Sequence, residues 1–267
     1  PPATQTVRRG PVSEAARLMA EGATSAVQQV QRSLEVINRL QPELNAFAHV
    51  DSEASLLKQA ETLDAERTAG QVRSPLHGLP VSIKDVIHVK GMPTSSGSKV
   101  MDGFMPDDDA TAVRLLREAG ALMVGKAHTH EFALGVTTPQ SRNPWDSRRD
   151  PGGSSGGSAI SVVTGMCLLR VGTDTRASIR VPASLCGTLG YKPTYGLAST
   201  DGIVTLSWSM DHTGLMGSTS EDVAILMNVL QGVDPTDPGT LDRPDDDDTG
   251  YLFKDVTGFR VGLAVEG

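Results

Sequence analysis

The sequence predicts an α/β fold, with a mixed, largely parallel central sheet covered by helices on both faces. From residue 79 onward, short apolar runs typical of strands alternate with helical patterns. Leu168, Leu169 and Val171 form an apolar run of the kind found in a central strand with both faces covered. With 267 residues, 38% of them hydrophobic, the chain can build a substantial core. We expect one structural domain overall, with a helical layer over residues 1–70 and a core over residues 71–267.

Three helices are expected in the N-terminal layer. Ser13 is in place to cap a first helix that ends before Gly22. A second helix is predicted over residues 24–40, with Pro42 beyond its end, and a third over residues 52–68. The second helix carries a single apolar stripe, made of Val27, Val30, Leu34 and Ile37. The layer could pack on the core or on a second subunit, which leaves a homodimer open.

Strands and helices then alternate. The pattern predicts a strand over residues 81–86, a helix over residues 111–119 and a strand over residues 121–126. Further on, residues 158–166 resemble a short buried helix, and residues 167–175 a strand that runs into a turn. Such alternation is typical of a sheet with helices on both faces.

The C-terminal part contains fewer regular patterns. A strand is predicted over residues 196–200, and a helix begins at Ser220, where acidic residues favour the first turn. An acidic connector over residues 233–250 leads to a final strand over residues 259–265.

A glycine- and serine-rich loop occupies residues 151–158. Four glycines, which allow close backbone approaches, surround Ser154 and Ser155. A flexible linker is one interpretation of this composition, but a buried helix and a strand follow it directly. A phosphate-binding loop is another, but no Gly-Lys-Ser/Thr sequence closes the run. The loop is therefore expected to be an ordered part of the core.

Several motifs follow one another in order around this loop. They are His77-Gly78-Leu79-Pro80-Val81-Ser82-Ile83-Lys84-Asp85, Gly152-Gly153-Ser154-Ser155-Gly156-Gly157-Ser158, Gly172-Thr173-Asp174-Thr175, Ser178-Ile179-Arg180 and Gly190-Tyr191-Lys192-Pro193-Thr194-Tyr195-Gly196. From about residue 77 to residue 230, the chain resembles the amidase signature family. The resemblance implies the amidase signature fold. Members of that family normally continue well past residue 267, so it also implies a catalytic core whose C-terminal part is missing.

The resemblance further implies a Ser/Ser/Lys catalytic triad that needs no metal or organic cofactor. Ser178 matches the nucleophile, Ser154 the bridging serine held in a cis peptide, and Lys84 the general base. Ser155, the neighbouring hydroxyl, is expected to assist by hydrogen bonding.

Such a triad requires an uncharged lysine. A serine hydroxyl is a weak nucleophile until a base takes its proton, and burial or nearby cations depress a lysine pKa. In the predicted strand, Val81 and Ile83 alternate with Ser82 and Lys84. Lys84 is therefore expected to point away from the apolar layer, at a strand end that faces a cleft.

The resemblance also implies an oxyanion hole, made by backbone N–H groups of the turn that ends at the nucleophile. These belong to Thr175, Arg176, Ala177 and Ser178. The family usually has two glycines in place of Arg176 and Ala177. An arginine with positive φ would cost about 1–2 kcal/mol. Its guanidinium could fill the acyl pocket or bind a substrate carboxylate.

Charged residues flank this turn. Asp174 and Arg180 are expected to form a supporting ion pair, because buried charges are normally paired; a substrate contact is the second interpretation.

His212 and Asp211 suggest a Ser/His/Asp triad. Adjacent strand residues face opposite ways, however, so Lys84 explains the base better.

Metal binding is not expected. His128, His130 and Glu131 could ligate zinc, but no further ligand cluster follows at metal spacing. Residues 245–248 are four aspartates without the spacing and glycine of a calcium loop. The two cysteines are too few for a disulfide framework and are expected to be buried thiols.

The net charge of −8 and the pI near 5.2 argue against direct nucleic-acid binding. No apolar run approaches the roughly 20 residues that cross a bilayer, and residues 1–20 lack a signal-peptide core. These features predict a cytoplasmic location and no membrane contact.

The resemblance and the candidate triad predict hydrolysis of a small carboxylic amide to an acid and ammonia or an amine, through a serine acyl-enzyme. One alternative is the glutaminase (A) subunit of a glutamyl-tRNA amidotransferase, which would need partner subunits. Another is a truncated or impaired relative that acts as a binding or assembly module, suggested by Arg176, Ala177 and the missing C-terminal part. Aliphatic, aromatic and dicarboxylic amides all stay open as substrates.

Overall fold

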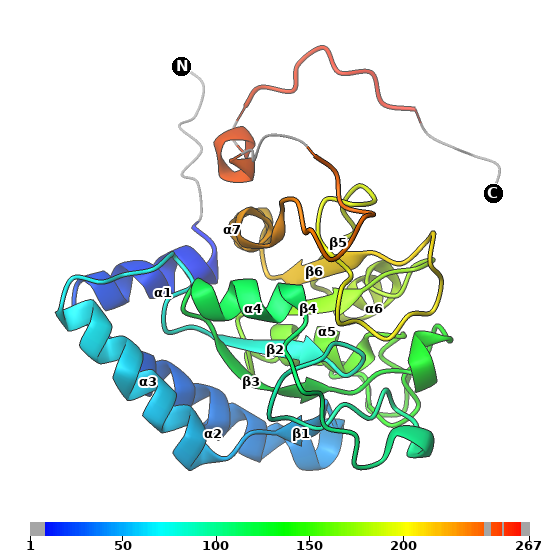
Figure 1. Ribbon diagram of the computed structural model, residues 1–267, viewed down its shortest axis with the longest axis horizontal. Helices are drawn as coiled ribbons and strands as arrows, with labels where there is room; N and C mark the ends of the chain where they lie inside the picture. Colours follow the sequence, from blue (N-terminus) through cyan, green and yellow to red (C-terminus); the bar gives the residue numbers. More distant parts are fainter. Residues whose placement is uncertain (1–8, 243–246, 253, 263–267) are drawn as a thin grey trace.

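A six-stranded mixed sheet forms the centre of the molecule (Figure 1). The computed structural model describes residues 9–242, 247–252 and 254–262. Its strands are β1 (Phe47–Val50), β2 (Pro80–Lys84), β3 (Leu122–Ala127), β4 (Leu169–Thr173), β5 (Leu189–Tyr191) and β6 (Thr213–Gly217). They lie in the order β1-β3-β2-β4-β6-β5. Strands β3, β2 and β4 run parallel, and β1, β6 and β5 pair antiparallel with their neighbours. The predicted fold class, a mixed sheet with parallel strands at its centre, is confirmed.

Helices cover both faces of this sheet. One face packs against α1 (Pro11–Ala20), α4 (Thr111–Glu118) and α7 (Ser220–Leu230). The other packs against α2 (Ala26–Leu44), α3 (Glu53–Thr68), α5 (Gly156–Val163) and α6 (Arg180–Cys186). Helices α2 and α3 lie side by side at one end of the sheet (Figure 1). Short 3₁₀ turns are η1 (Lys99–Met101), η2 (Glu131–Ala133) and η3 (Asp248–Tyr251).

The first two helices differ from the prediction at their ends. Helix α1 begins at Pro11 after Gly10, so the predicted cap at Ser13 is wrong. Proline is well suited to a first helical position, because its φ is already helical and its missing N–H would have no partner there. Helix α2 does not stop before Pro42 but continues to Leu44. A proline costs a helix one backbone hydrogen bond, and local side-chain contacts hold this end.

The Gln41 side chain holds the end of α2 and leads the chain into β1. Its amide oxygen accepts from the N–H groups of Ala46 at 2.9 Å and Phe47 at 3.0 Å, and its amide nitrogen donates to the Phe47 carbonyl at 2.7 Å. Strand β1 pairs with β3 and was not predicted. Four residues are too few for a clear alternating pattern.

Alternation along β2 directs two kinds of side chain to opposite faces. Val81 and Ile83 belong to the core cluster shared with α1, α4 and α7. Ser82 faces α5, where its hydroxyl lies 2.8 Å from the Ser161 hydroxyl. Lys84 follows Ser82 on that face, as predicted. Along β2, the polar residues therefore lie on the face that α5 covers.

The predicted strand over residues 196–200 is wrong. Gly196 has a φ of 80°, which turns the chain, and Ala198 forms only an isolated bridge to another segment. The hydroxyl of Thr200 donates to the Asp237 carboxylate at 2.9 Å. In this segment, hydrogen bonds to side chains of the acidic connector thus take the place of the backbone hydrogen bonds of a strand.

The C-terminal predictions have mixed outcomes. Helix α7 begins at Ser220 as expected, behind a capping box between Thr219 and Asp222. The final strand predicted over residues 259–265 is wrong where the chain is described, because residues 259–262 are exposed and belong to no strand. Residues 263–265 lie outside the described residues, as do Asp245 and Asp246 of the aspartate run. Strands β5 and β6 and helix α6 were not predicted.

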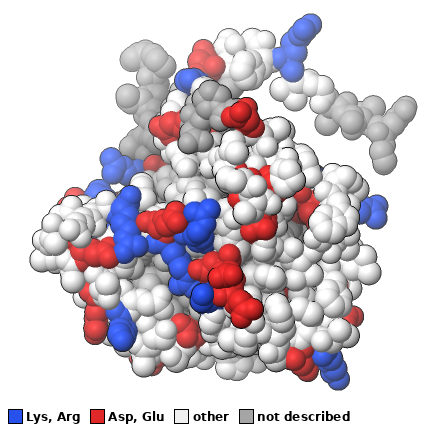
Figure 2. All heavy atoms as spheres, viewed as in Figure 1, with Lys and Arg blue, Asp and Glu red and all other residues white. Residues whose placement is uncertain are grey.

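Acidic and basic side chains gather over α4 on the face shown in Figure 2. They form the ion pairs Arg73–Glu66, Arg117–Asp109 and Arg114–Glu118. In the part of the chain that the structure describes, no helix combines the length and apolar character needed to span a membrane.

Candidate active site

The three residues of the predicted triad come from elements that meet at one edge of the sheet. Lys84 is the last residue of β2, Ser154 lies in the loop before α5, and Ser178 lies in the turn between β4 and α6. Because β2 and β4 are parallel neighbours, their carboxyl ends lie at the same edge. All three residues are buried, with Lys84 and Ser154 0% and Ser178 6% exposed.

Lys84 contacts two hydroxyl groups. Its Nζ lies 2.7 Å from the Ser154 Oγ and 2.8 Å from the Thr173 Oγ1, with the Thr173 carbonyl oxygen further away at 3.4 Å. Neither near partner is charged. The lysine amine is therefore held against the serine by neutral hydrogen-bonding groups.

Burial strongly lowers the pKa of Lys84, and the Arg170 guanidinium lowers it further. Asp174 and Asp211 act in the opposite direction but do not overcome the burial. Removal from water disfavours the ammonium form, because no carboxylate contact replaces the lost hydration. An amine in these surroundings suits the acceptance of a proton.

The loop that carries Ser154 is packed into the core. The peptide bond between Gly153 and Ser154 is cis. A Cβ at Gly153 would lie 2.0 Å from the Thr137 carbonyl oxygen, so only glycine fits there. The Thr138 hydroxyl donates to the Gly152 carbonyl at 2.9 Å and accepts from the Gly156 N–H at 2.9 Å. The flexible-linker interpretation is therefore wrong.

The turn that carries Ser178 rests directly on this loop. The Ser155 N–H donates to the Ser178 carbonyl at 3.2 Å. The Ser155 hydroxyl donates to the Thr173 carbonyl over a longer distance of 3.4 Å. The structure thus brings Ser154, Ser155, Ser178 and Lys84 together around the end of β4.

The turn over residues 175–178 presents unused backbone donors. Among the described residues, none of its N–H groups donates a backbone or side-chain hydrogen bond. Arg176 and Ala177 do not have positive φ, so the strain considered for Arg176 is absent. The Arg176 side chain is exposed. Backbone donors that face no internal acceptor fit the stabilisation of an oxyanion.

Asp174 and Arg180 form the predicted ion pair. The Arg180 Nε and Nη2 lie 3.1 Å from the two carboxylate oxygens of Asp174. The same carboxylate accepts from the N–H groups of Ile179 at 3.2 Å and Arg180 at 3.5 Å. Asp174 is fully buried, so this network fixes the backbone on either side of Ser178.

Asp211 does not orient His212. Its carboxylate accepts from the Thr175 hydroxyl at 2.5 Å and from the N–H groups of Leu206 at 2.7 Å and Ser207 at 2.9 Å. The His212 Nδ1 lies 2.6 Å from the Met210 carbonyl oxygen instead. The Ser/His/Asp arrangement therefore lacks its carboxylate–imidazole contact.

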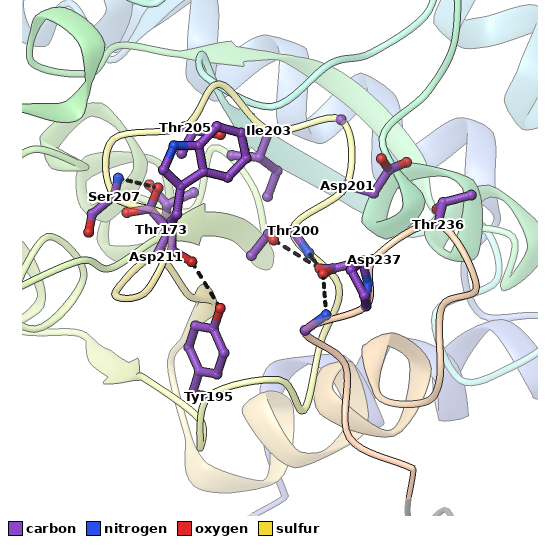
Figure 3. A pocket seen from close by; sticks show the side chains of 14 residues that line it. Thr173, Tyr195, Thr200, Asp201, Ile203, Thr205, Ser207, Asp211, Thr236 and Asp237 are labelled. Carbon is purple, nitrogen blue, oxygen red and sulfur yellow. Dashed lines mark hydrogen bonds between the residues drawn. The ribbon is translucent and has the colours of Figure 1, made fainter.

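A cavity of about 340 Å³ opens beside these residues. Figure 3 shows Thr173, Asp211 and Tyr195 on one side of it and Asp201 and Asp237 on the other. Thr173 both lines the cavity and binds the Lys84 amine. A molecule in the cavity would therefore contact a residue that binds Lys84.

The surroundings of His128, His130 and Glu131 bear on the zinc site considered from the sequence. His128 is largely buried, which lowers its pKa, and Glu131 accepts a hydrogen bond from Ser98 at 2.6 Å. Within the described residues, no group of three or more His, Cys, Asp or Glu side chains is placed to hold a metal ion. Cys167 and Cys186 are free and buried.

Three residues of the site were missed in the sequence. Thr173 ends β4 as Lys84 ends β2, so pairing these parallel strands would have pointed to it. Arg170 lies within an apolar run, and a charged residue in such a run is a signal for a buried charge. Thr138 offered no signal, because its contacts depend on how a distant loop folds back.

Known proteins resemble the chain in sequence. A family model described as Amidase matches residues 28–266. The A subunit of the glutamyl-tRNA(Gln) amidotransferase of Chloroflexus aggregans is 43% identical over 260 residues, which make up 96% of this chain and 53% of that protein. The corresponding protein of Maridesulfovibrio salexigens is 45% identical over 258 residues, 94% of this chain and 52% of that protein. The chain spans about half the length of the curated relatives it matches.

Solved structures resemble the chain in fold and in sequence. The native peptide amidase from Stenotrophomonas maltophilia has a TM-score of 0.85 at 34% identity, covering 94% of this chain and 53% of that chain. The A subunit of the glutamyl-tRNA(Gln) amidotransferase from Thermotoga maritima has a TM-score of 0.76 at 40% identity, covering 87% of this chain and 49% of that chain.

Proposed function

Because the chain belongs to the Amidase family, we propose that it hydrolyses the carbon–nitrogen bond of a carboxylic amide. The products are an acid and ammonia or an amine. Ser178 is the nucleophile, Ser154 the bridge and Lys84 the base, and a small amide binds in the cavity beside Thr173. The reaction needs no cofactor, and the two free thiols fit a cytoplasmic location.

In the first half of the reaction, the Ser178 Oγ attacks the amide carbonyl carbon. Its proton passes to the Ser154 Oγ, whose own proton passes to the Lys84 Nζ over the 2.7 Å contact. The carbonyl oxygen becomes an oxyanion and accepts hydrogen bonds from backbone N–H groups of residues 175–178. When this intermediate collapses, the Lys84 ammonium returns a proton through Ser154 to the departing amine.

In the second half, water hydrolyses the ester on Ser178. The uncharged Lys84 again takes a proton through Ser154, now from the attacking water. Collapse of the second tetrahedral intermediate releases the acid and returns the proton to the Ser178 Oγ. The site ends in the state in which it began.

The 2.7 Å contact between Lys84 and Ser154 carries this proposal. A lysine that is 0% exposed and touches only hydroxyl and carbonyl groups has little support as a structural cation. The position of Lys84 at the end of β2 and its lowered pKa both suit a proton acceptor.

A second candidate is the amide-hydrolysing subunit of a glutamyl-tRNA amidotransferase. The names of relatives at 43% and 45% identity favour it. In that case the amide is glutamine, and partner subunits receive the ammonia. Ammonia release from glutamine that requires added partner subunits would support this candidate over an independent amidase.

The test is an ammonia-release screen over aliphatic, aromatic and dicarboxylic amides and glutamine. The Ser178→Ala variant is expected to lose at least about a thousandfold in kcat/KM on any amide that wild type hydrolyses. Ser158→Ala is the matched control. Ser158 is a buried serine of the same motif, and its hydroxyl has no hydrogen-bond partner among the described residues, so this variant should keep the wild-type rate.

Trapping the intermediate supplies an independent measurement. Hydroxylamine should convert the Ser178 acyl-enzyme to a hydroxamate, and mass spectrometry of the quenched enzyme should find the acyl group on Ser178. Equal ammonia release by wild type and Ser178→Ala would contradict the proposal. No release from any amide, even with partner subunits, would favour a binding or assembly module.

A further inference from the structure

A buried arginine lies on the same face of the sheet as Lys84. Arg170 lies on β4 in register with Ser82 and is 0% exposed. Its Nη1 reaches the Ser155 carbonyl oxygen at 3.5 Å, which is long for a hydrogen bond. Its Nε and Nη2 have no hydrogen-bond partner among the described residues.

The guanidinium lies beneath the serine loop. A Cβ built on Gly172 would lie 2.4 Å from the Arg170 Nη2 and 3.5 Å from the Ser155 Oγ. Only a glycine at position 172 leaves space for this side chain. The arginine thus occupies a place between β4 and the loop that carries Ser154.

No carboxylate neutralises this arginine within the described part of the chain. Asp174 is paired with Arg180, and Asp211 accepts from a hydroxyl and two backbone N–H groups. An unpaired buried cation costs stability, and replacing buried charges by apolar groups is often stabilising. Packing alone therefore gives no reason for an arginine at this position.

We propose that Arg170 is a positioning residue, whose buried, unpaired guanidinium keeps the Lys84 amine uncharged and ready to accept the proton of Ser154. This inference rests on the proposed function, because it assigns Lys84 the role of base. A fixed positive charge near an amine disfavours a second positive charge. Arginine suits this purpose better than lysine, since it retains its own proton when buried.

The surrounding charges agree with this role. Burial lowers the pKa of Arg170 to about 9, so it stays charged at neutral pH. The Cys186 thiol faces it from α6, and burial raises the pKa of that thiol to about 12, so it supplies no anion. The titratable groups that act on Lys84 or Arg170 are Asp174, Asp211 and Cys186, and Asp174 is paired with Arg180.

The test compares wild type with Arg170→Gln and Arg170→Met, two neutral variants. The titration of Lys84 is followed by NMR of its Cε and Nζ resonances, assigned with Lys84→Arg. In both variants the midpoint should move to higher pH. At pH 7, kcat/KM should fall about tenfold, and the difference should disappear at high pH, where the amine is uncharged in every variant.

The matched control is Arg67→Gln. Arg67 also has a buried Nε without a partner, but it lies on α3 and binds the His77 carbonyl. This variant should leave the Lys84 titration and the pH profile unchanged. Thermal unfolding separates charge from packing, because Arg170→Met should raise the melting temperature while it lowers the rate at neutral pH.

An unmoved Lys84 titration in either neutral variant would overturn the inference. A rate lowered equally at all pH values, or a neutral variant that fails to fold, would also overturn it, because both outcomes indicate a packing role. The NMR titration needs no substrate. If wild type hydrolyses no amide, the proposed function fails while the effect of Arg170 on Lys84 is still measured.

Discussion

Two buried lysines on neighbouring strands have opposite surroundings. Lys84 on β2 and Lys126 on β3 are both 0% exposed. The Lys126 Nζ lies 3.1 Å from an Asp85 carboxylate oxygen and 2.6 Å from the Thr94 hydroxyl. The Lys84 Nζ touches the hydroxyls of Ser154 and Thr173 and no carboxylate of the described residues.

The comparison shows that the two lysines differ in their partners and not in their burial. Burial lowers the pKa of both amines. Asp85 opposes the shift at Lys126, whereas Arg170 adds to it at Lys84. Lys126 is paired with Ile83 in the ladder, so it lies on the face opposite Lys84. Among the described residues, the amine on one face of the sheet thus contacts a carboxylate, and the amine on the other face does not.

The largest expected effect is the loss of activity in Lys84→Met. Without a proton acceptor, kcat/KM should fall by about 10²–10⁴-fold, the usual contribution of a general base. Methionine fills the same buried space and carries no charge to remove from water, so the fold should be kept. Ammonia release and thermal unfolding measure the two effects. Activity within about tenfold of wild type would remove Lys84 from the mechanism.

The pH dependence of the wild-type activity tests the lowered pKa that distinguishes Lys84. The pKa of Lys84 lies well below 10.5, so activity should rise with pH as the amine loses its proton and should be lost on the acidic side. The free energy of unfolding should also rise with pH. Between the folded and unfolded pKa values of Lys84, the unfolded chain binds more protons than the folded chain. Wild type should therefore gain stability relative to Lys84→Met as the pH rises towards 10.5.

The second expected effect is a loss of stability in Lys126→Met. This change leaves the Asp85 carboxylate buried without its cation, which should cost about 3–5 kcal/mol of unfolding free energy. Denaturant unfolding measures it. In the double variant Lys126→Met/Asp85→Asn, much of this loss should be recovered, because no charge is then left unpaired. A single variant as stable as wild type would show that the pair does not hold Lys126 in place.

The smallest expected effect belongs to the exposed ion pairs over α4. Arg114 and Glu118 are 3.1 Å apart, and their side chains are 51% and 60% exposed. Glu118→Gln should change the unfolding free energy by less than about 0.5 kcal/mol, because water and salt screen such a pair. A loss as large as that of Lys126→Met would contradict the distinction between buried and exposed charges.

The sequence by itself predicted the alternation of strands and helices in the centre of the chain and the motifs of the candidate site. Alternation along residues 80–84 placed Lys84 on the polar face of its strand, because side chains of a strand alternate with a period of two residues. The resemblance of the glycine and serine motifs to the amidase signature family pointed to Ser154 and Ser178 as candidate site residues. The short edge strands β1 and β5 were missed because so few residues carry no clear period.

Only the tertiary structure decided what each buried charge does. The pairing of Lys126 with Asp85, the neutral contacts of Lys84 and the unpaired guanidinium of Arg170 depend on which strands become neighbours. Residues far apart in the chain meet when β2, β3 and β4 pair, and electrostatic energies depend on those distances and on burial. A local pattern contains neither, so the sequence could predict Lys84 as a candidate base but not the charges that surround it.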